Sequence, residues 1–148
     1  DNFWATLKDI QTLDAIFSGA FRKIVQNNRE LHRQHIDQLA SQVVRQIEQS
    51  YADSDLSPTR IADSLGMSSA YLGRIFREST QTSISQYLNQ TRIRRAEELL
   101  RETEQPVETV AGLVGFSNPK YFYVVFKNIT GQTPLQYRKE VHSASEKN

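Results

Sequence analysis

The chain has 148 residues, 38% of them hydrophobic, which is enough for one ordinary domain or a small domain with an extension. Eighteen lysines and arginines against seventeen aspartates and glutamates leave a net charge of +1, which by itself argues against a nucleic-acid partner. The absence of cysteine excludes a disulfide framework, a thiol nucleophile and a cysteine-based zinc site. No apolar run approaches the roughly 18 residues of a membrane span. We expect a soluble, mostly helical protein.

The first 35 residues form a predicted helical linker or coupling segment. The chain starts at Asp1 and not at Met, so we expect a fragment of a longer protein. No signal-peptide pattern is present. Two interpretations of the segment stay open: a coiled coil that makes a homodimer, and the end of a missing sensory or receiver domain. The polar stretch 26–34 is interpreted as a linker or a frayed helix. The coiled-coil interpretation rests on large apolar residues seven positions apart, with Leu13 and Ala20 between them: Phe3, Ile10, Phe17, Ile24 and Leu31.

From residue 36 onward, apolar residues recur at helical spacing in seven segments, without a hairpin signal between them. Each of the four prolines fits the start of a helix, where a missing N–H costs nothing. Gly66, Gly115 and Gly131 follow apolar stretches, where a left-handed residue ends a helix. We therefore expect an all-α fold. The segments are 36–51, 61–65, 72–76, 84–100, 107–114, 122–126 and 135–137.

Two of these helix pairs repeat one another. Residues 61–68 match residues 110–117 at an offset of 49, and after one extra residue 71–80 match 121–130 at an offset of 50. Each copy predicts a short helix, a tight turn at a glycine and a longer helix capped by serine. This is the pattern of a helix-turn-helix unit, whose second helix enters the major groove of DNA.

The two copies and the helix between them resemble the AraC/XylS DNA-binding domain over residues 36–140. The resemblance rests on Leu65-Gly66-Met67-Ser68, Tyr71-Leu72 and Phe76-Arg77 in the first half, on Arg92-Ile93 and Leu99-Leu100 in the linking helix, and on Val114-Gly115-Phe116-Ser117, Tyr121-Phe122 and Phe126-Lys127 in the second half. The closing Gly131-x-Thr133-Pro134-x-x-Tyr137-Arg138 is highly specific.

The resemblance implies a seven-helix domain of two helix-turn-helix subdomains joined by a long linker helix, with an N-terminal helical extension. The domain would span 36–141 and 142–148 would be a disordered tail. The expected parts are a first helix-turn-helix at about 57–80, a linker helix at about 83–103 and a second helix-turn-helix at about 106–130. Two recognition helices would enter successive major-groove segments of double-stranded DNA to control transcription. The resemblance also implies a bacterial, cytoplasmic activator that touches RNA polymerase.

The positions of the charged residues favour a nucleic-acid partner, although the net charge of +1 does not. Both recognition segments are basic, and an acidic block from Glu97 to Glu108 separates them. We expect the basic blocks to contact phosphate and the acidic block to face away from DNA. The basic residues are Arg74, Arg77, Arg92, Arg94 and Arg95 in the first block and Lys120, Lys127, Arg138 and Lys139 in the second.

The resemblance assigns base-reading positions to the first recognition helix, and the second offers candidates for DNA contact. In the first, these are Ser69, Ala70, Gly73 and Arg74, of which Arg74 is the best candidate because a guanidinium bonds a guanine edge in bidentate fashion. In the second, Asn118, Lys120 and Tyr123 are candidates for a contact with either a base or the DNA backbone. Arg77 and Lys127 are expected to contact phosphate.

The chain departs from the family in two places. Tyr123-Val124 stands where a basic residue commonly follows the aromatic pair, so we expect the second half to contribute affinity more than sequence choice. Gln81 replaces a glycine that Gly131 keeps in the second copy, which puts the turn geometry there in question.

Other functions fit the sequence less well. A helical protein-interaction module without DNA affinity is the alternative function. An enzyme is not expected, because alkyl-transfer relatives of this domain need cysteine. His32 and His35 have no clustered cysteines or carboxylates beside them, so we expect neither a metal nor a cofactor. Phe76, Phe126, Leu72 and Phe122 are predicted core residues, and Tyr87 and Tyr137 are predicted to pack against helices.

Overall fold

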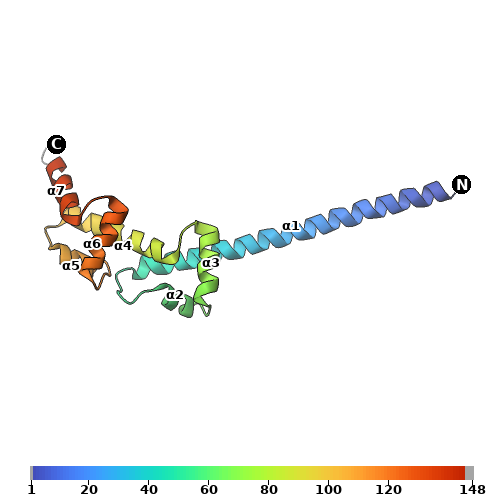
Figure 1. The fold of residues 1–148 in the computed structure, drawn as a ribbon. Coiled ribbons are helices and arrows are strands. Elements are labelled where there is room, and N and C mark those ends of the chain that lie inside the picture. The colour runs from blue at the N-terminus through green and yellow to red at the C-terminus, as the bar shows by residue number, and fades with distance from the viewer. Residues whose placement is uncertain (1, 146–148) are drawn as a thin grey trace. The chain divides into compact units, whose positions relative to one another are not determined.

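A computed structural model describes residues 2–145, without the side chains of residues 4, 5 and 145. Within them the chain forms seven helices and no strand (Figure 1). The expected all-α fold with a long linker helix is confirmed. None of the described helices is both long and apolar enough to cross a membrane. The helices are α1 (Phe3–Ser50), α2 (Pro58–Ser64), α3 (Ser69–Thr80), α4 (Ile84–Glu102), α5 (Val107–Leu113), α6 (Pro119–Thr130) and α7 (Pro134–Ser145).

The chain divides into two units, residues 1–38 and 39–148. In the first unit, α1 is helical through 26–34, so the expected linker or frayed helix there is wrong. The apolar seam is exposed along the unit, from 54% at Leu13 to 73% at Phe17. The large apolar side chains of the seam therefore form an exposed stripe along this part of α1.

The second unit holds two hydrophobic cores, one for each copy of the repeat. The first core packs the end of α1 against α2, α3 and the start of α4, around the fully buried Ile47, Leu72 and Phe76. The second packs the rest of α4 against α5, α6 and α7, around Phe122 and Phe126. These outcomes confirm the predicted core phenylalanines and Leu72.

The helix α4 serves both cores and is the linker between the subdomains (Figure 1). Its early residues Ile84 and Leu88 lie in the first core, and Ile93, Ala96 and Leu100 lie in the second. A capping box at Ser83 and Gln86 starts the helix, since Ser83 Oγ accepts from Gln86 N and Gln86 Oε1 accepts from Ser83 N.

The two copies share their turn chemistry as well as their sequence. In both, the residue after the glycine donates to the carbonyl five residues back, Met67 N to Ala62 O and Phe116 N to Ala111 O, each at 2.9 Å. These are Schellman turns, and Gly66 and Gly115 have the positive φ that such turns need. Both alanines are fully buried, which lets the second helix of each copy approach closely.

Three prolines occupy the helix starts predicted for them, Pro58, Pro119 and Pro134. Pro106 instead stands one residue earlier, as the N-cap of α5, and makes no side-chain cap. Residues 142–145, expected in a disordered tail, continue α7, and residues 146–148 lie outside the described residues.

The turn after α3 keeps its geometry without glycine. Gln81 has φ +60, in the same left-handed region as Gly131 with φ +82, and both residues donate their N–H to the carbonyl four residues back. The Gln81 side chain adds a 3.2 Å hydrogen bond from Nε2 to Glu78 O. The turn after α3 therefore has the same geometry as the turn after α6, although a residue with a Cβ is strained in this conformation.

Candidate nucleic-acid interface

The first recognition helix, α3, presents the predicted base-reading residues on one surface. Ser68 caps the helix by accepting from Tyr71 N at 3.2 Å, and Leu72, Ile75 and Phe76 anchor its inner face in the core. This anchoring leaves the opposite face to solvent, where Ser69, Ala70, Arg74 and Arg77 are exposed.

These residues share one open hollow of about 590 Å³. No atom lies within 4 Å of a Cβ built on Gly73, so the surface around it is unobstructed. The Arg74 guanidinium lies 5.5 Å from the Tyr71 ring centroid, a cation–π contact that limits the arginine's freedom. The hollow also contains the acidic Glu78. Its lining is Ser69, Ala70, Gly73, Arg74, Arg77, Glu78, Gln81 and Ser83.

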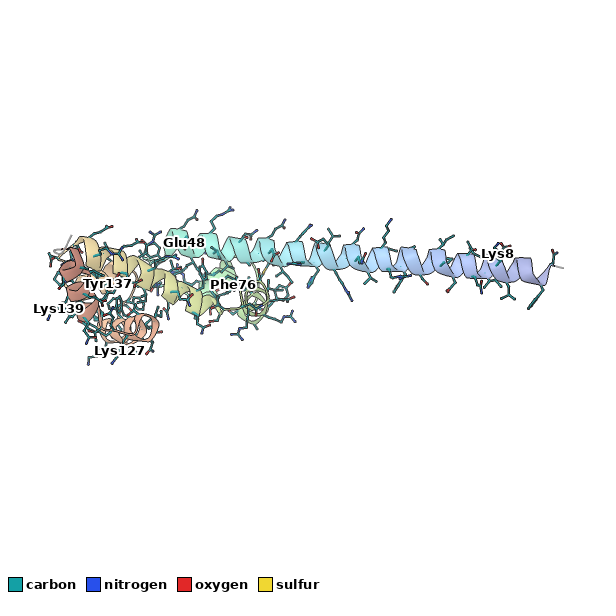
Figure 2. All side chains as sticks on the ribbon, turned by 90° about the horizontal axis from the view of Figure 1, so that it is seen from above. Lys8, Glu48, Phe76, Lys127, Tyr137 and Lys139 are labelled. Atoms are coloured by element: carbon teal, nitrogen blue, oxygen red, sulfur yellow. The ribbon has the colours of Figure 1, made fainter. Side chains whose placement is uncertain are left out.

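The second recognition helix, α6, has the same length and register as α3. Both have 12 residues, and Phe122, Val125 and Phe126 take the buried positions of Leu72, Ile75 and Phe76. Lys120 and Lys127 are exposed on the outer face. Figure 2 shows Lys127 at the surface of this unit.

Two predicted α6 residues have structural partners. Asn118 is the N-cap, and its Oδ1 accepts from Lys120 N at 3.0 Å and Tyr121 N at 3.3 Å. Tyr123 is half-buried and packs edge-on against Phe122, with 6.2 Å between ring centroids. Burial raises the pKa of the Tyr123 hydroxyl, and Glu108 adds to the rise.

A second hollow, of about 350 Å³, lies between α4 and α6, and none of the predicted α6 residues lines it. Its lining includes Val124, which is 56% exposed, and Tyr121, which is 51% exposed. Asn89 of α4 donates to the Tyr121 hydroxyl at 3.3 Å across this hollow. The sequence interpretation missed Val124, although the offset of 50 places it at the position of Arg74.

The predicted phosphate role is wrong for part of the first basic block. Arg92 is only 7% exposed and donates to two backbone carbonyls, Nε to Tyr51 O and Nη2 to Asp53 O, each at 2.8 Å. Its burial lowers the pKa of the guanidinium, against an opposing effect of Asp53. Its role is therefore structural.

Two more arginines of the block are paired within the protein. Arg94 Nη2 lies 2.7 Å from Glu48, and Arg95 lies 3.6 Å from Glu48 and 3.1 Å from Glu98. The hydrogen bond that Arg95 Nη1 donates to Glu98 Oε2 is the main reason that the pKa of Arg95 is raised. In the second block, Arg138 Nη2 donates to Gln105 O at 2.5 Å.

The remaining predicted cations of the recognition helices are available to a ligand. Within the described residues, Arg74, Arg77, Lys120 and Lys127 have no ion-pair partner. Glu48, which forms ion pairs with Arg94 and Arg95, and Lys127 lie at opposite edges of this unit in Figure 2. Unpaired cations on the outer faces of two equivalent helices are suited to phosphate.

Comparison with known proteins agrees with this geometry. The helix-turn-helix domain family matches residues 61–140. The Msm operon regulatory protein of Streptococcus mutans is 37% identical over 100 residues, covering 68% of this chain and 36% of that protein. The chain spans 14% to 41% of the length of the curated relatives that it matches, and about a third of the first three.

Two solved structures share the fold of the second unit. The C-terminal domain of AraT, a response regulator from Geobacillus stearothermophilus, is 31% identical with a TM-score of 0.67, covering 69% of this chain and 84% of that one. The DNA-binding domain of AdpA in complex with a target DNA is 25% identical with a TM-score of 0.68, covering 74% of this chain and 97% of that one. Together with the duplicated helix-turn-helix, these matches show that the chain belongs to the AraC/XylS type of helix-turn-helix DNA-binding domains.

Proposed function

We propose that this chain binds double-stranded DNA in a sequence-specific manner and regulates transcription, with α3 and α6 in successive major-groove segments. The observation that carries the proposal is the equivalence of the two helices. Each has 12 residues, a capped start, a buried inner face and outer cations without an ion-pair partner in the described part of the chain. The DNA complex of the related AdpA domain supports it.

The exposed residues divide into two roles. Arg77 and Lys127 occupy equivalent positions, and we assign both to phosphate. The base-reading group includes Arg74, whose guanidinium is exposed in the first hollow. Asn118 retains only its amide N–H groups for a base, since its oxygen caps α6. The base-reading residues are Ser69, Ala70, Gly73 and Arg74 on α3 and Asn118, Lys120 and Tyr123 at α6.

The wider role of the protein belongs to the same proposal. We assign it activation of transcription through contact with RNA polymerase, a location in the bacterial cytoplasm where its DNA lies, and a binding rather than a catalytic role. Relatives named as operon regulators support the regulatory part. The division into a coupling segment (1–35) and a DNA-binding domain (36–141) is part of the proposal.

Homodimerisation is proposed for the first unit because its apolar seam is exposed at heptad positions. Analytical ultracentrifugation of the chain tests it. We expect a dimer that dissociates when Phe17 and Ile24 are replaced by aspartate, whereas a monomer at all concentrations would refute dimerisation and leave DNA binding by the monomer open.

The salt dependence of binding to duplex DNA tests the proposed DNA affinity. Counterion release predicts a steep fall in affinity between low and moderate salt. Lys127→Ala is expected to weaken binding to every duplex and to reduce the log–log salt slope by about 1. Lys8→Ala, in the first unit, is a charge-matched control that leaves the slope unchanged. A chain that binds no duplex even at low salt would instead fit the alternative of a protein-interaction module.

A further inference from the structure

The outer face of α6 carries an apolar residue between two lysines. Lys120, Val124 and Lys127 follow one another at helical spacing of four and three, so they lie along one stripe of the helix. All three are exposed. The equivalent stripe of α3, at an offset of 50, is Ala70, Arg74 and Arg77.

Val124 therefore stands where α3 has its best base-reading residue. The inner faces of the two helices are anchored by equivalent buried side chains, so equivalent outer positions point the same way from their cores. Val124 is 56% exposed, and a fold that needed it for packing would have buried it. The Val124 side chain is therefore outside the core and open to contact with a ligand.

The charge and the apolar character of the Lys120–Val124–Lys127 stripe indicate the kind of ligand that it fits. Two lysines one turn to each side of Val124 favour a polyanion, and α6 has no acidic residue to oppose it. In the major groove of DNA the apolar feature of the base edges is the C5-methyl group of thymine. A branched aliphatic side chain offers no hydrogen bond to other base edges, so it distinguishes thymine by contact alone.

We propose that Val124 reads a thymine methyl in the major-groove segment that α6 enters, so the second subdomain contributes sequence choice as well as affinity. The proposal rests on the proposed DNA binding and deepens it. The absence of a basic residue at this position led us to expect affinity more than sequence choice from the second subdomain. Under the proposal, Val124 makes no hydrogen bond to a base but still distinguishes thymine through its methyl group.

Deoxyuridine provides the test, because it lacks only the methyl group of thymidine. The full 148-residue chain first selects a duplex from a pool with a randomised core at low salt. Each thymine of the selected duplex is then replaced singly by deoxyuridine. We expect the affinity to fall roughly fourfold at one or two positions, the effect of losing one buried methyl contact.

Variants identify the side chain responsible. Val124→Ala is expected to weaken binding to the thymine duplex roughly fourfold and to abolish its preference over the deoxyuridine duplex at that position. Ile129→Ala is the matched control: Ile129 is an exposed aliphatic residue of α6 that lies off the Lys120–Val124–Lys127 stripe, and its loss should leave the preference intact.

The outcomes separate the two proposals. If the chain selects no duplex, DNA binding itself fails and the reading of thymine fails with it. If the chain binds but no thymine can be replaced with a measurable loss, or if Val124→Ala keeps the same preference, only the reading by Val124 is overturned. An apolar contact with a protein partner would then account for the exposed face.

Discussion

The guanidinium of Arg92 lies over the ring of Phe116, 5.6 Å from its centroid. The same side chain donates hydrogen bonds to the carbonyls of Tyr51 and Asp53, which precede α2. Arg92 belongs to the linker helix, Phe116 to the turn before α6, and the two carbonyls to the entry of the first copy. One buried side chain thus joins both helix-turn-helix subdomains through α4, and the relative placement of α3 and α6 depends on it.

Arg92→Lys is predicted to destabilise the domain by about 2–3 kcal/mol. Lysine keeps the charge but cannot reproduce the fork that reaches two carbonyls, and it leaves one of them without its charged donor. Urea unfolding followed by circular dichroism measures the change. Arg94→Lys, which alters an exposed pair with Glu48, should cost less than about 1 kcal/mol. Equal effects of the two substitutions would show that Arg92 does not join the subdomains.

The two turn glycines are predicted to differ in their tolerance of alanine. A Cβ at Gly115 would lie 2.3 Å from Tyr51 O and 2.8 Å from Arg92 Nε, whereas a Cβ at Gly66 meets nothing within 4 Å. Gly66→Ala should therefore cost about 1–2 kcal/mol, from the left-handed backbone alone. Gly115→Ala adds a clash with backbone and should cost roughly 3 kcal/mol or more. Thermal unfolding of the two variants compares them, and similar melting temperatures would contradict the packing described.

The left-handed residue after α3 offers a stabilising substitution. Gln81→Gly removes the Cβ strain at φ +60 and loses one exposed hydrogen bond to Glu78 O, so we predict a net gain of about 0.5–1 kcal/mol. Gly131→Gln places the same strain after α6 and should cost a similar amount. The free energy of unfolding in urea measures both, and a loss of stability in Gln81→Gly would mean that the hydrogen bond outweighs the strain.

Glu97 gives the stability a pH dependence. Burial raises the pKa of its carboxyl above the ordinary value of 4.5, although Arg101 opposes the rise. Because the folded pKa lies above the unfolded one, the contribution of Glu97 to stability is fully present below the unfolded pKa and is lost as pH rises through the folded pKa. Glu97→Gln should therefore be more stable than the parent chain at pH 7, and the difference should shrink as pH falls through the raised folded pKa and be lost below the unfolded value of 4.5.

Unfolding at several pH values measures this difference. Glu98→Gln is the control, since Glu98 pairs with Arg95 at 3.1 Å and its loss should give no gain at pH 7. A Glu97→Gln variant with the stability of the parent chain at pH 7 would show that burial of the charged Glu97 carboxyl does not destabilise the fold.

The sequence was sufficient to predict the features that depend on local chemistry. Capping residues, the prolines at helix starts and the glycines with positive φ act within one turn of the chain, so Gly66 and Gly115 were identifiable from their neighbours. The repeat and the buried Phe76 and Phe126 followed from spacing. Tyr87 and Tyr137 pack edge-on against these two phenylalanines, as expected.

The features that the sequence did not predict depend on distant partners. From the sequence, Arg92 is predicted to contact phosphate, because the two carbonyls that bind it are about forty positions earlier in the chain and nothing near Arg92 indicates them. The pairing of Arg94 and Arg95 with Glu48 was not predicted either, since Glu48 lies in another helix. Spacing alone also did not predict that Leu135 is 58% exposed, although it follows the helical pattern of apolar residues. The charge of a segment does not reveal which of its cations are neutralised in the fold.

Reading of one duplex by α3 and α6 together is tested most directly by hydroxyl-radical footprinting on the selected duplex. We predict two protected patches on one face of the DNA, about one helical turn apart. Arg74→Ala should relax the preference for one or two base pairs in one patch only, while the chain stays folded. A single protected patch, or an effect of Arg74→Ala spread equally over the whole site, would contradict the reading of one duplex by both helices.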